Sequence, residues 1–202
     1  MKAEEIERVL QPYLEGEAAP AGLFERLEVY LGLLVKWNAR TNLTAIREPG
    51  EMVRRHFGES LFAARQLGAV GTLLDFGSGA GFPGLPMQLW RPEVTVTLAE
   101  SQNKKATFLR EVARTLGLGT EVWASRVEGM AAGRVFEVVA LRAVDDMGVA
   151  VPAASVRVAG GGRMMVLTTG KMVLEGVEGF GVEGEVGIPG GMDQVVRVLR
   201  RG

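Results

Sequence analysis

The feature that most constrains this chain is an apolar run that ends in an acid and then breaks into glycines at alternate positions. The run and the loop after it span Leu73–Gly84 and read LLDFGSGAGFPG. Glycines at these positions let the backbone turn tightly and approach a ligand where any Cβ atom would collide. A strand followed by such a loop is typical of a nucleotide-binding corner in an α/β sheet. The segment therefore predicts a site for a ligand that contains adenosine.

Two kinds of ligand fit this loop. The dinucleotide pattern G-x-G-x-x-G can be laid on Gly79–Gly84, but its first glycine should directly follow the strand, where Gly77 stands. The pattern acid-x-G-x-G-x-G over Asp75–Gly81 resembles motif I of the methyltransferases that use S-adenosylmethionine (SAM). Pro83 also fits poorly with a helix that supplies free N–H groups to a pyrophosphate. The loop favours SAM over a dinucleotide, and a glycine-rich turn without a ligand is the remaining alternative.

A second acid ends the next apolar stretch. Val94–Glu100 alternates branched and small residues like a buried strand and finishes with Glu100. In doubly wound α/β folds an acid at the end of the second strand binds the ribose, because a carboxylate accepts the hydrogen bonds that the two hydroxyls donate. The alternative is an acid that caps the following helix, which Ser101 or Asn103 would do equally well. We favour ribose binding for Glu100 and place Ser101 beside it in the cofactor site.

Composition limits the classes of protein that fit. The 202 residues suffice for one domain with a substantial core. With no cysteine and one histidine, disulfides, a cysteine nucleophile and cysteine- or histidine-rich metal sites are excluded, and we expect no bound metal. No apolar run reaches a membrane-spanning length and the N-terminus lacks a signal peptide's apolar region, so we expect a cytoplasmic protein without membrane contact. The net charge of −1 argues against general nucleic-acid binding but leaves room for a local basic face.

Helical and strand patterns divide the chain near residue 66. Apolar residues recur at three- and four-residue steps up to that point, and we expect residues 1–66 to form a helical extension packed on a core of residues 67–202. Beyond it strand and helix patterns alternate, which predicts an α/β, Rossmann-like fold of the class I SAM-dependent methyltransferase type, with a doubly wound, mostly parallel sheet. The strands are expected at Thr72–Phe76, Val94–Glu100, Glu121–Ala124, Phe136–Ala140, Arg163–Thr168 and Val195–Leu199. The later helices are expected at Leu85–Trp90 and Asn103–Leu116, and an edge hairpin at Gly176–Gly191.

Several segments then resemble one family in their order along the chain. They are Asn42-Leu43-Thr44-Ala45-Ile46, Arg55-His56-Phe57 with Ser60-Leu61, Asp75–Gly84, Lys104-Lys105 with Phe108–Glu111, and Arg142-Ala143-Val144. Together they look like the bacterial 16S ribosomal RNA guanine methyltransferases, a family also called glucose-inhibited division protein B. The resemblance runs from about residue 24 to residue 170, and the full string Gly77–Gly84 is far more specific than its glycines alone.

The resemblance implies that SAM donates a methyl group to ring nitrogen 7 of one guanine in 16S rRNA, with that RNA or the small ribosomal subunit as the partner. This nitrogen is an acceptor that already carries an in-plane lone pair at neutral pH. No proton has to leave before it attacks the sulfonium methyl, so catalysis can rest on proximity, alignment and electrostatics. A chain with one histidine and no cysteine suits this chemistry.

The resemblance also implies roles for single residues. Arg142 matches an arginine at the methyl-transfer end, where it would bind the base edge or a phosphate; the alternative is a surface salt bridge. His56 joins it as a catalytic candidate that lines the way in for cofactor or RNA; the alternative is a polar side chain satisfied at a helix end. The expected cofactor-binding residues are Asp75, Gly77, Gly79, Gly81, Phe82, Glu100, Ser101, Val127, Glu128 and Arg142. The expected RNA phosphate contacts are Arg47, Arg54, Arg55, Lys104, Lys105 and Arg110, of which the last three are alternatively a solvated helix face.

The sequence departs from the family on the substrate side. Gly58-Glu59 stands where the family more often has a small apolar residue and Asp, Leu141 stands where Ser is common, and Leu167–Lys171 is a loose version of the usual ending. Three other functions stay open at this point: a SAM enzyme for a small metabolite or a protein, an NAD-binding protein, and an RNA-binding module with a vestigial pocket. With no coiled-coil repeat, a monomer is the default expectation.

Overall fold

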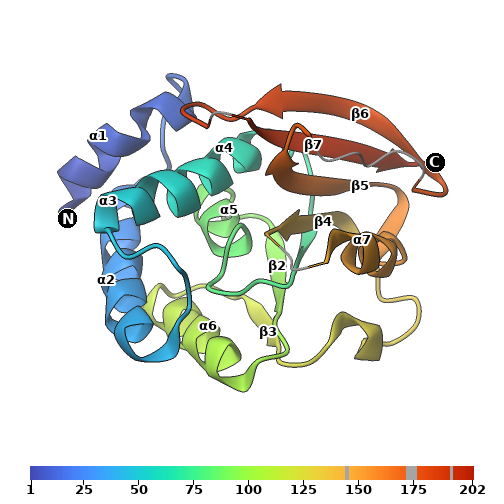
Figure 1. Ribbon diagram of the computed structural model, residues 1–202, viewed down its shortest axis with the longest axis horizontal. Helices are drawn as coiled ribbons and strands as arrows, with labels where there is room; N and C mark the ends of the chain where they lie inside the picture. The colour runs from blue at the N-terminus through green and yellow to red at the C-terminus, as the bar shows by residue number, and fades with distance from the viewer. Residues whose placement is uncertain (144–145, 172–176, 192) are drawn as a thin grey trace.

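The computed structural model describes residues 1–143, 146–171, 177–191 and 193–202. Within these residues, one seven-stranded sheet has the order β3-β2-β1-β4-β5-β7-β6 (Figure 1). The strands are β1 Thr72–Phe76, β2 Thr95–Ala99, β3 Glu121–Trp123, β4 Phe136–Arg142, β5 Val158–Thr169, β6 Phe180–Gly187 and β7 Gln194–Arg201.

The sheet is parallel from β3 to β5 and has a switch point at β1. β1 pairs in parallel with β2 on one side and with β4 on the other, so Leu74 lies opposite both Thr97 and Val139. β7 runs antiparallel to its neighbours β5 and β6. In open α/β sheets ligands bind outside the carboxyl ends of the strands where the strand order reverses. The topology therefore directs attention to the loop after β1 and to the ends of β2 and β4.

Helices lie before the sheet in sequence and between its strands. The stretch predicted as helical before residue 66 includes an unbroken run in which α3 passes into a π-helical turn, Val53–Gly58, and then into α4. π-helical turns are rare in proteins, and those that occur are often found at functional sites. The α-helices are α1 Ala3–Leu14, α2 Leu23–Thr41, α3 Pro49–Met52, α4 Glu59–Arg65, α5 Gly84–Trp90, α6 Asn103–Thr115 and α7 Met147–Ser155.

Apolar side chains cover both faces of the sheet, because successive residues of a strand point to opposite sides. Leu73 and Val138 belong to a cluster formed with α1, α2, α4, α5 and α6. Leu74 and Val139 belong to a second cluster, which includes Ala154 of α7. Figure 1 shows α1 and α2 at one end of the molecule and α7 at the other. The predicted doubly wound, mostly parallel fold is confirmed.

The predicted strands are all present. β4 runs two residues further than expected, so that Arg142 is its last residue, and β7 is longer than expected at both ends. Two other regions differ more. β5 begins at Val158 rather than Arg163, and α7 was not predicted. The α7 sequence is almost wholly apolar and shows no helical stripe; its start depends on Asp146, whose side chain accepts a hydrogen bond from the Val149 N–H at 3.2 Å. The described part of the expected hairpin, residues 177–191, instead supplies the single strand β6, which forms a hairpin with β7. Gly176, like Val144 of the family motif, lies outside the described residues.

Residues before position 66 share their core with the sheet. Ile6 of α1 and Leu27 of α2 are fully buried and belong to the same cluster as Leu73. The division into residues 1–66 and 67–202 stays a prediction. Within the described part of the chain, no helix has both the length and the apolar character needed to cross a membrane.

Candidate functional site

The buried side chain of Asp75 anchors the glycine loop through a hydrogen bond to its backbone. Its side chain is fully buried at the end of β1, and its Oδ2 accepts a hydrogen bond from the Gly84 N–H at 2.9 Å. Ser78 continues the anchoring, because its hydroxyl donates to the Asp75 carbonyl and its N–H donates to the Ala99 carbonyl, both at 2.9 Å. Burial raises the pKa of Asp75 to about 7. The acid before the loop thus ties the end of β1 to the start of α5.

The glycines of the loop face two different environments. A Cβ atom on Gly79 would meet only open space and the Gly77 carbonyl at 3.9 Å, whereas on Gly81 it would lie 2.5 Å from Leu85 Cδ1 and also against the Tyr30 hydroxyl. All three loop glycines have positive φ, at +71°, +55° and +94° in chain order. Gly79 therefore faces open space, and Gly81 allows the loop to pack against Tyr30 of α2 and Leu85 of α5.

The loop is not arranged for a dinucleotide. In that fingerprint the N–H groups at the start of the following helix face a pyrophosphate. Here the N–H of Gly84, the first residue of α5, already points at the buried Asp75 carboxylate, and a Cβ on Gly84 would lie 2.6 Å from Leu98 Cδ2. The NAD-binding alternative left open by the sequence loses its main support.

Glu100 lies where the loop meets the end of β2. Its Oε2 accepts a hydrogen bond from the Gly79 N–H at 3.0 Å, and its Oε1 accepts one from the Gln102 N–H at 2.7 Å. Only 7% of the residue is exposed. A carboxylate has about four acceptor sites, so two remain for the hydroxyls of a ligand.

Glu100 lines one cavity, and a second cavity shares Gly77 and Ser101 with the first. The loop cavity has a volume of about 340 Å³, and the β3 cavity one of about 270 Å³. The loop cavity is lined by Leu43, Thr44, His56, Gly77, Ser78, Gly79, Ala80, Phe82, Glu100, Ser101, Gln102, Lys105, Arg142 and Ala143. The β3 cavity is lined by Phe76, Gly77, Ala99, Ser101, Ser125, Arg126, Val127, Glu128, Asp146, Val149, Ala150 and Ala153.

Most of the predicted cofactor residues line these cavities, and two lie beneath them. Gly77, Gly79, Phe82, Glu100, Ser101 and Arg142 line the loop cavity, and Val127 and Glu128 line the β3 cavity. Asp75 and Gly81 line neither cavity, because their contacts are with the loop's own backbone and with the core. The Phe82 ring stacks between the rings of Tyr30 (5.4 Å, 6°) and His56 (4.7 Å, 20°).

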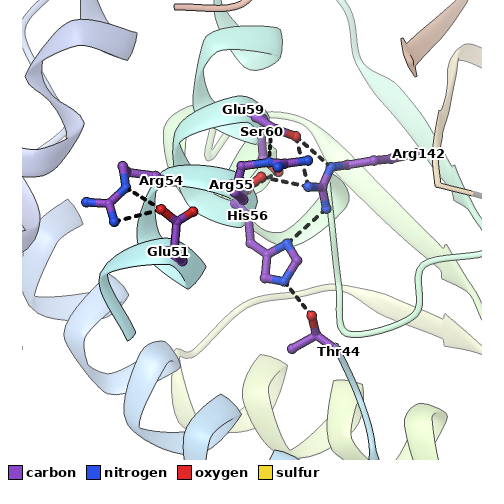
Figure 2. Close-up of polar contacts among 8 residues, drawn as sticks. All are labelled: Thr44, Glu51, Arg54, Arg55, His56, Glu59, Ser60 and Arg142. Carbon is purple, nitrogen blue, oxygen red and sulfur yellow. Dashed lines mark hydrogen bonds and ion pairs between the residues drawn. The ribbon is translucent and has the colours of Figure 1, made fainter. Parts of the chain in front are cut away.

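A chain of hydrogen bonds joins Thr44, His56 and Arg142 (Figure 2), and all three residues line the loop cavity. His56 Nε2 lies 2.8 Å from the Thr44 hydroxyl, and His56 Nδ1 lies 3.1 Å from Arg142 Nη1. Since a guanidinium only donates, Nδ1 must be the acceptor of that bond. The neutral ring therefore carries its proton on Nε2 and donates it to Thr44. Burial, with Arg142 and Arg55 as nearby cations, lowers the pKa of His56 to about 3.

Arg142 is fixed by a buried acid as well. Its Nη2 lies 2.9 Å from Oε2 of Glu59 and donates to the Arg55 carbonyl at 2.6 Å. Oε1 of the same Glu59 accepts from Arg55 Nε at 2.7 Å. The exposed fractions of the two side chains are 12% for Arg142 and 6% for Glu59. The guanidinium is thus a positioned group and not a surface ion pair. The π-helical turn supplies two of its partners, Arg55 and His56, and the first residue of α4, Glu59, supplies the third.

The candidate RNA contacts are spread over several surfaces. Arg54 pairs with Glu51 and points away from His56 and Arg142 (Figure 2). Lys105 lines the loop cavity. The others are exposed: Arg47 and Lys104 line a separate hollow at the end of α2, Arg55 lies beside Glu59, and Arg110 lies on α6.

The comparison with known families decides the relationship. A family model described as "GidB: rRNA small subunit methyltransferase G" matches residues 23–180. This chain belongs to the GidB family. A GidB relative from Xanthomonas axonopodis, named ribosomal RNA small subunit methyltransferase G, is 42% identical over 72% of this chain and 68% of its own length. A second, from Alkalilimnicola ehrlichii and with the same name, is 42% identical over 75% of this chain and 69% of its own length. The family predicted from the motifs is confirmed.

Solved structures support the fold of this GidB chain. A ribosomal protein L11 methylase from Lactobacillus delbrueckii matches 73% of this chain and 78% of its own, with a TM-score of 0.58 at 11% identity. The TYW2 protein of P. horikoshii, solved in complex with MeSAdo, matches 72% of this chain and 62% of its own, with a TM-score of 0.58 at 15% identity. The class I methyltransferase fold expected from the sequence is confirmed.

Sequence reasoning gave no role to two residues of the site. Thr44 stood within a quoted family motif, and Glu59 was noted only as a departure from the family. A signal for Glu59 was present, since Arg55 and Glu59 are four residues apart on a predicted helix and so face one another. For Thr44 the motif was the only signal, because its partner His56 lies twelve residues away across a loop.

Proposed function

We propose that this chain transfers the methyl group of SAM to ring nitrogen 7 of a guanine in 16S rRNA. The observation that carries the proposal is the pair of joined cavities over the ends of β1 and β2 in a chain of the GidB family. The β3 cavity has apolar walls that suit adenine, and Glu100 keeps two acceptor sites for the ribose. The loop cavity leads from there to His56 and Arg142. The residues present therefore fit SAM.

Bound SAM supplies an electrophilic methyl group on a sulfonium. In the proposed reaction the N7 lone pair would form the new N–C bond as the S–C bond breaks, so the sulfur would keep the bonding electrons and the positive charge would move to the guanine. No proton is transferred in this step, so it needs no general base. His56 is hydrogen-bonded on both ring nitrogens, and Asp75 is sealed below the loop. The contribution of the chain is to hold the two reactants in line and to exclude water.

The proposal is tested by the modified nucleoside. The protein is incubated with methyl-labelled SAM and 16S rRNA, either naked or in small subunits that lack the modification, and the nucleosides are identified by mass spectrometry. Label on N7 of one guanine supports the proposal. Whichever of naked 16S rRNA and small subunits is methylated more efficiently is then the preferred substrate. Label on another atom of the RNA contradicts the N7 assignment, and no label despite SAM binding contradicts the RNA substrate.

A matched pair of variants ties the activity to the cavities. Ser101 is exposed and lines both cavities, so Ser101→Trp should obstruct SAM and abolish methylation. Thr107 is exposed on α6 and lines neither of them, so Thr107→Trp should leave methylation unchanged. Equal loss in both variants would show that the substitution acts through folding and not through the cavity.

A further inference from the structure

A third cavity adjoins Arg142. This β5 cavity has a volume of about 260 Å³ and is lined by Arg55, Glu59, Arg142, Ala143, Met147, Leu167, Thr168, Thr169, Ile188 and Gln194. It shares Arg142 and Ala143 with the loop cavity. The Arg142 guanidinium therefore stands on the boundary between the proposed cofactor site and a second, separate space.

The size and walls of the β5 cavity suit a single ring system. Sites that hold a whole small molecule usually measure about 300–1,000 Å³, so this one is small. Leu167 and Ile188 are 5% and 4% exposed, and with Met147 they give it apolar walls. The charged lining residues are Arg55, Glu59 and Arg142, and neutral polar groups come from Thr168, Thr169 and Gln194. A ligand with an apolar face and a hydrogen-bonding edge that meets the Arg55–Glu59–Arg142 cluster would match these walls.

The polar end of the cavity offers donors rather than acceptors. Glu59 accepts from Arg55 Nε, from Arg142 Nε and Nη2, and from the Gln194 amide nitrogen at 2.7 Å in the amide orientation that satisfies both partners. These bonds occupy its acceptor sites. The hydrogen bonds that Arg142 makes to the described residues use four of its five N–H groups, which leaves one. Arg55 keeps further N–H groups at an exposed position.

We propose that the β5 cavity is the subsite for the guanine that receives the methyl group, an inference that rests on the proposed function. Guanine presents the O6 acceptor there, whereas adenine would present its N6 amino group to arginine N–H groups, which is a donor against a donor. O6 and N7 are neighbours on the same edge of the base. A base held through O6 at Arg142 therefore has N7 at the boundary with the loop cavity, where the SAM methyl would arrive.

The test fills the cavity from its open side. Thr169 is exposed at the end of β5 and lines the β5 cavity but not the loop cavity, so Thr169→Trp should fill the cavity without disturbing the core. Val186 of β6 is 44% exposed and lines neither, so Val186→Trp is the control. We expect Thr169→Trp to lower kcat/KM for rRNA methylation by about a hundredfold. Calorimetric binding of S-adenosylhomocysteine should not change in either variant.

Each outcome separates this proposal from the proposed function. Normal methylation by Thr169→Trp overturns the subsite, and weakened S-adenosylhomocysteine binding assigns the cavity to the cofactor instead. If the wild-type protein methylates no RNA, the proposed function fails, and the subsite is then judged by saturation-transfer NMR with GMP and AMP. A guanine site is supported if the wild-type protein transfers saturation to GMP but not to AMP, and if the GMP signal is lost in Thr169→Trp and kept in Val186→Trp. Equal signals from the two nucleotides, or none, overturn it.

Discussion

His56 provides a direct test of the site, because it is the only histidine in the chain and gives a single imidazole signal in NMR. Burial and two nearby arginines lower its pKa from 6.5 to about 3. At pH 5 an ordinary histidine is almost fully protonated, whereas a group with this pKa is about 1% protonated. We therefore expect the Cε1–H resonance to stay constant from pH 8 to pH 5, with ring nitrogen shifts that show the proton on Nε2.

The same shift has a consequence for stability. The folded pKa lies below the unfolded one, so the stability that neutral His56 contributes is present above pH 6.5 and is lost as the pH falls toward 3. A difference of 3.5 pH units at 1.36 kcal/mol each corresponds to about 5 kcal/mol, to an order of magnitude. Urea unfolding of the wild type and of His56→Gln at pH 7 and pH 4 would measure this contribution. We expect the difference in unfolding free energy between the two proteins to be smaller at pH 4 than at pH 7.

Two variants test whether the nearby arginine side chain Arg142 contributes to the lowered pKa of His56. Arg142→Gln removes a cation beside the ring and should raise the pKa of His56. Arg54 pairs with Glu51 and points away from the ring, so Arg54→Gln should leave the pKa of His56 unchanged. A wild-type resonance that titrates near pH 6.5, or a proton on Nδ1, would refute the reasoning about the His56–Arg142 contact.

Three further predictions follow from the loop and the ion pair. Gly81→Ala should destabilise the fold by about 2–5 kcal/mol, because its φ is positive and the new Cβ would overlap with the core. Gly79→Ala should cost about 1–2 kcal/mol through positive φ alone. Urea unfolding measures both, and equal costs would contradict the conclusion that Gly81 faces the core and Gly79 faces open space. The pKa of Asp75 is about 7 in the folded protein and 3.8 as the ordinary value. The contribution of Asp75 to the free energy of unfolding is therefore complete below pH 3.8 and falls by roughly 4 kcal/mol as the pH rises to 7. A difference in stability between the wild type and Asp75→Asn that does not change with pH would contradict this. Glu59→Gln leaves Arg142 without its buried partner and should cost about 3–5 kcal/mol in unfolding free energy; an unchanged unfolding midpoint would show that the pair is not needed.

Much of the fold was accessible from local patterns. β1 was predicted with its observed bounds, and β2 and β3 to within one residue at either end, because each is a short apolar run closed by an acid or by turn residues. α7 was missed because burial against β5, and not amphipathic spacing, holds an apolar helix of this kind. β6 was placed only by its pairing with β7, since glycine-rich strands carry a weak pattern of their own.

The residues of the loop show where local reasoning ends. The sequence Asp75–Gly81 identified a cofactor loop but assigned all of its marked residues to the ligand. Gly77 and Gly79 line the cavity, whereas Asp75 and Gly81 face inward. Which side a loop residue faces depends on what lies beneath it, here Tyr30, and that contact joins segments fifty residues apart.

The sequence by itself determined the family, the positions of most strands along the chain and the loop that marks the site, because these follow from motifs and from periodicity within short windows. Only the tertiary structure decided how the charged groups combine. Arg54 and Arg55 are neighbours in sequence, yet one pairs with Glu51 on the far side of the helix and the other joins Glu59 beside Arg142. Arg142 reaches His56 across 86 positions of sequence. Electrostatic and hydrogen-bond energies depend on distances in space, and the packing of the π-helical turn against the end of β4 sets those distances.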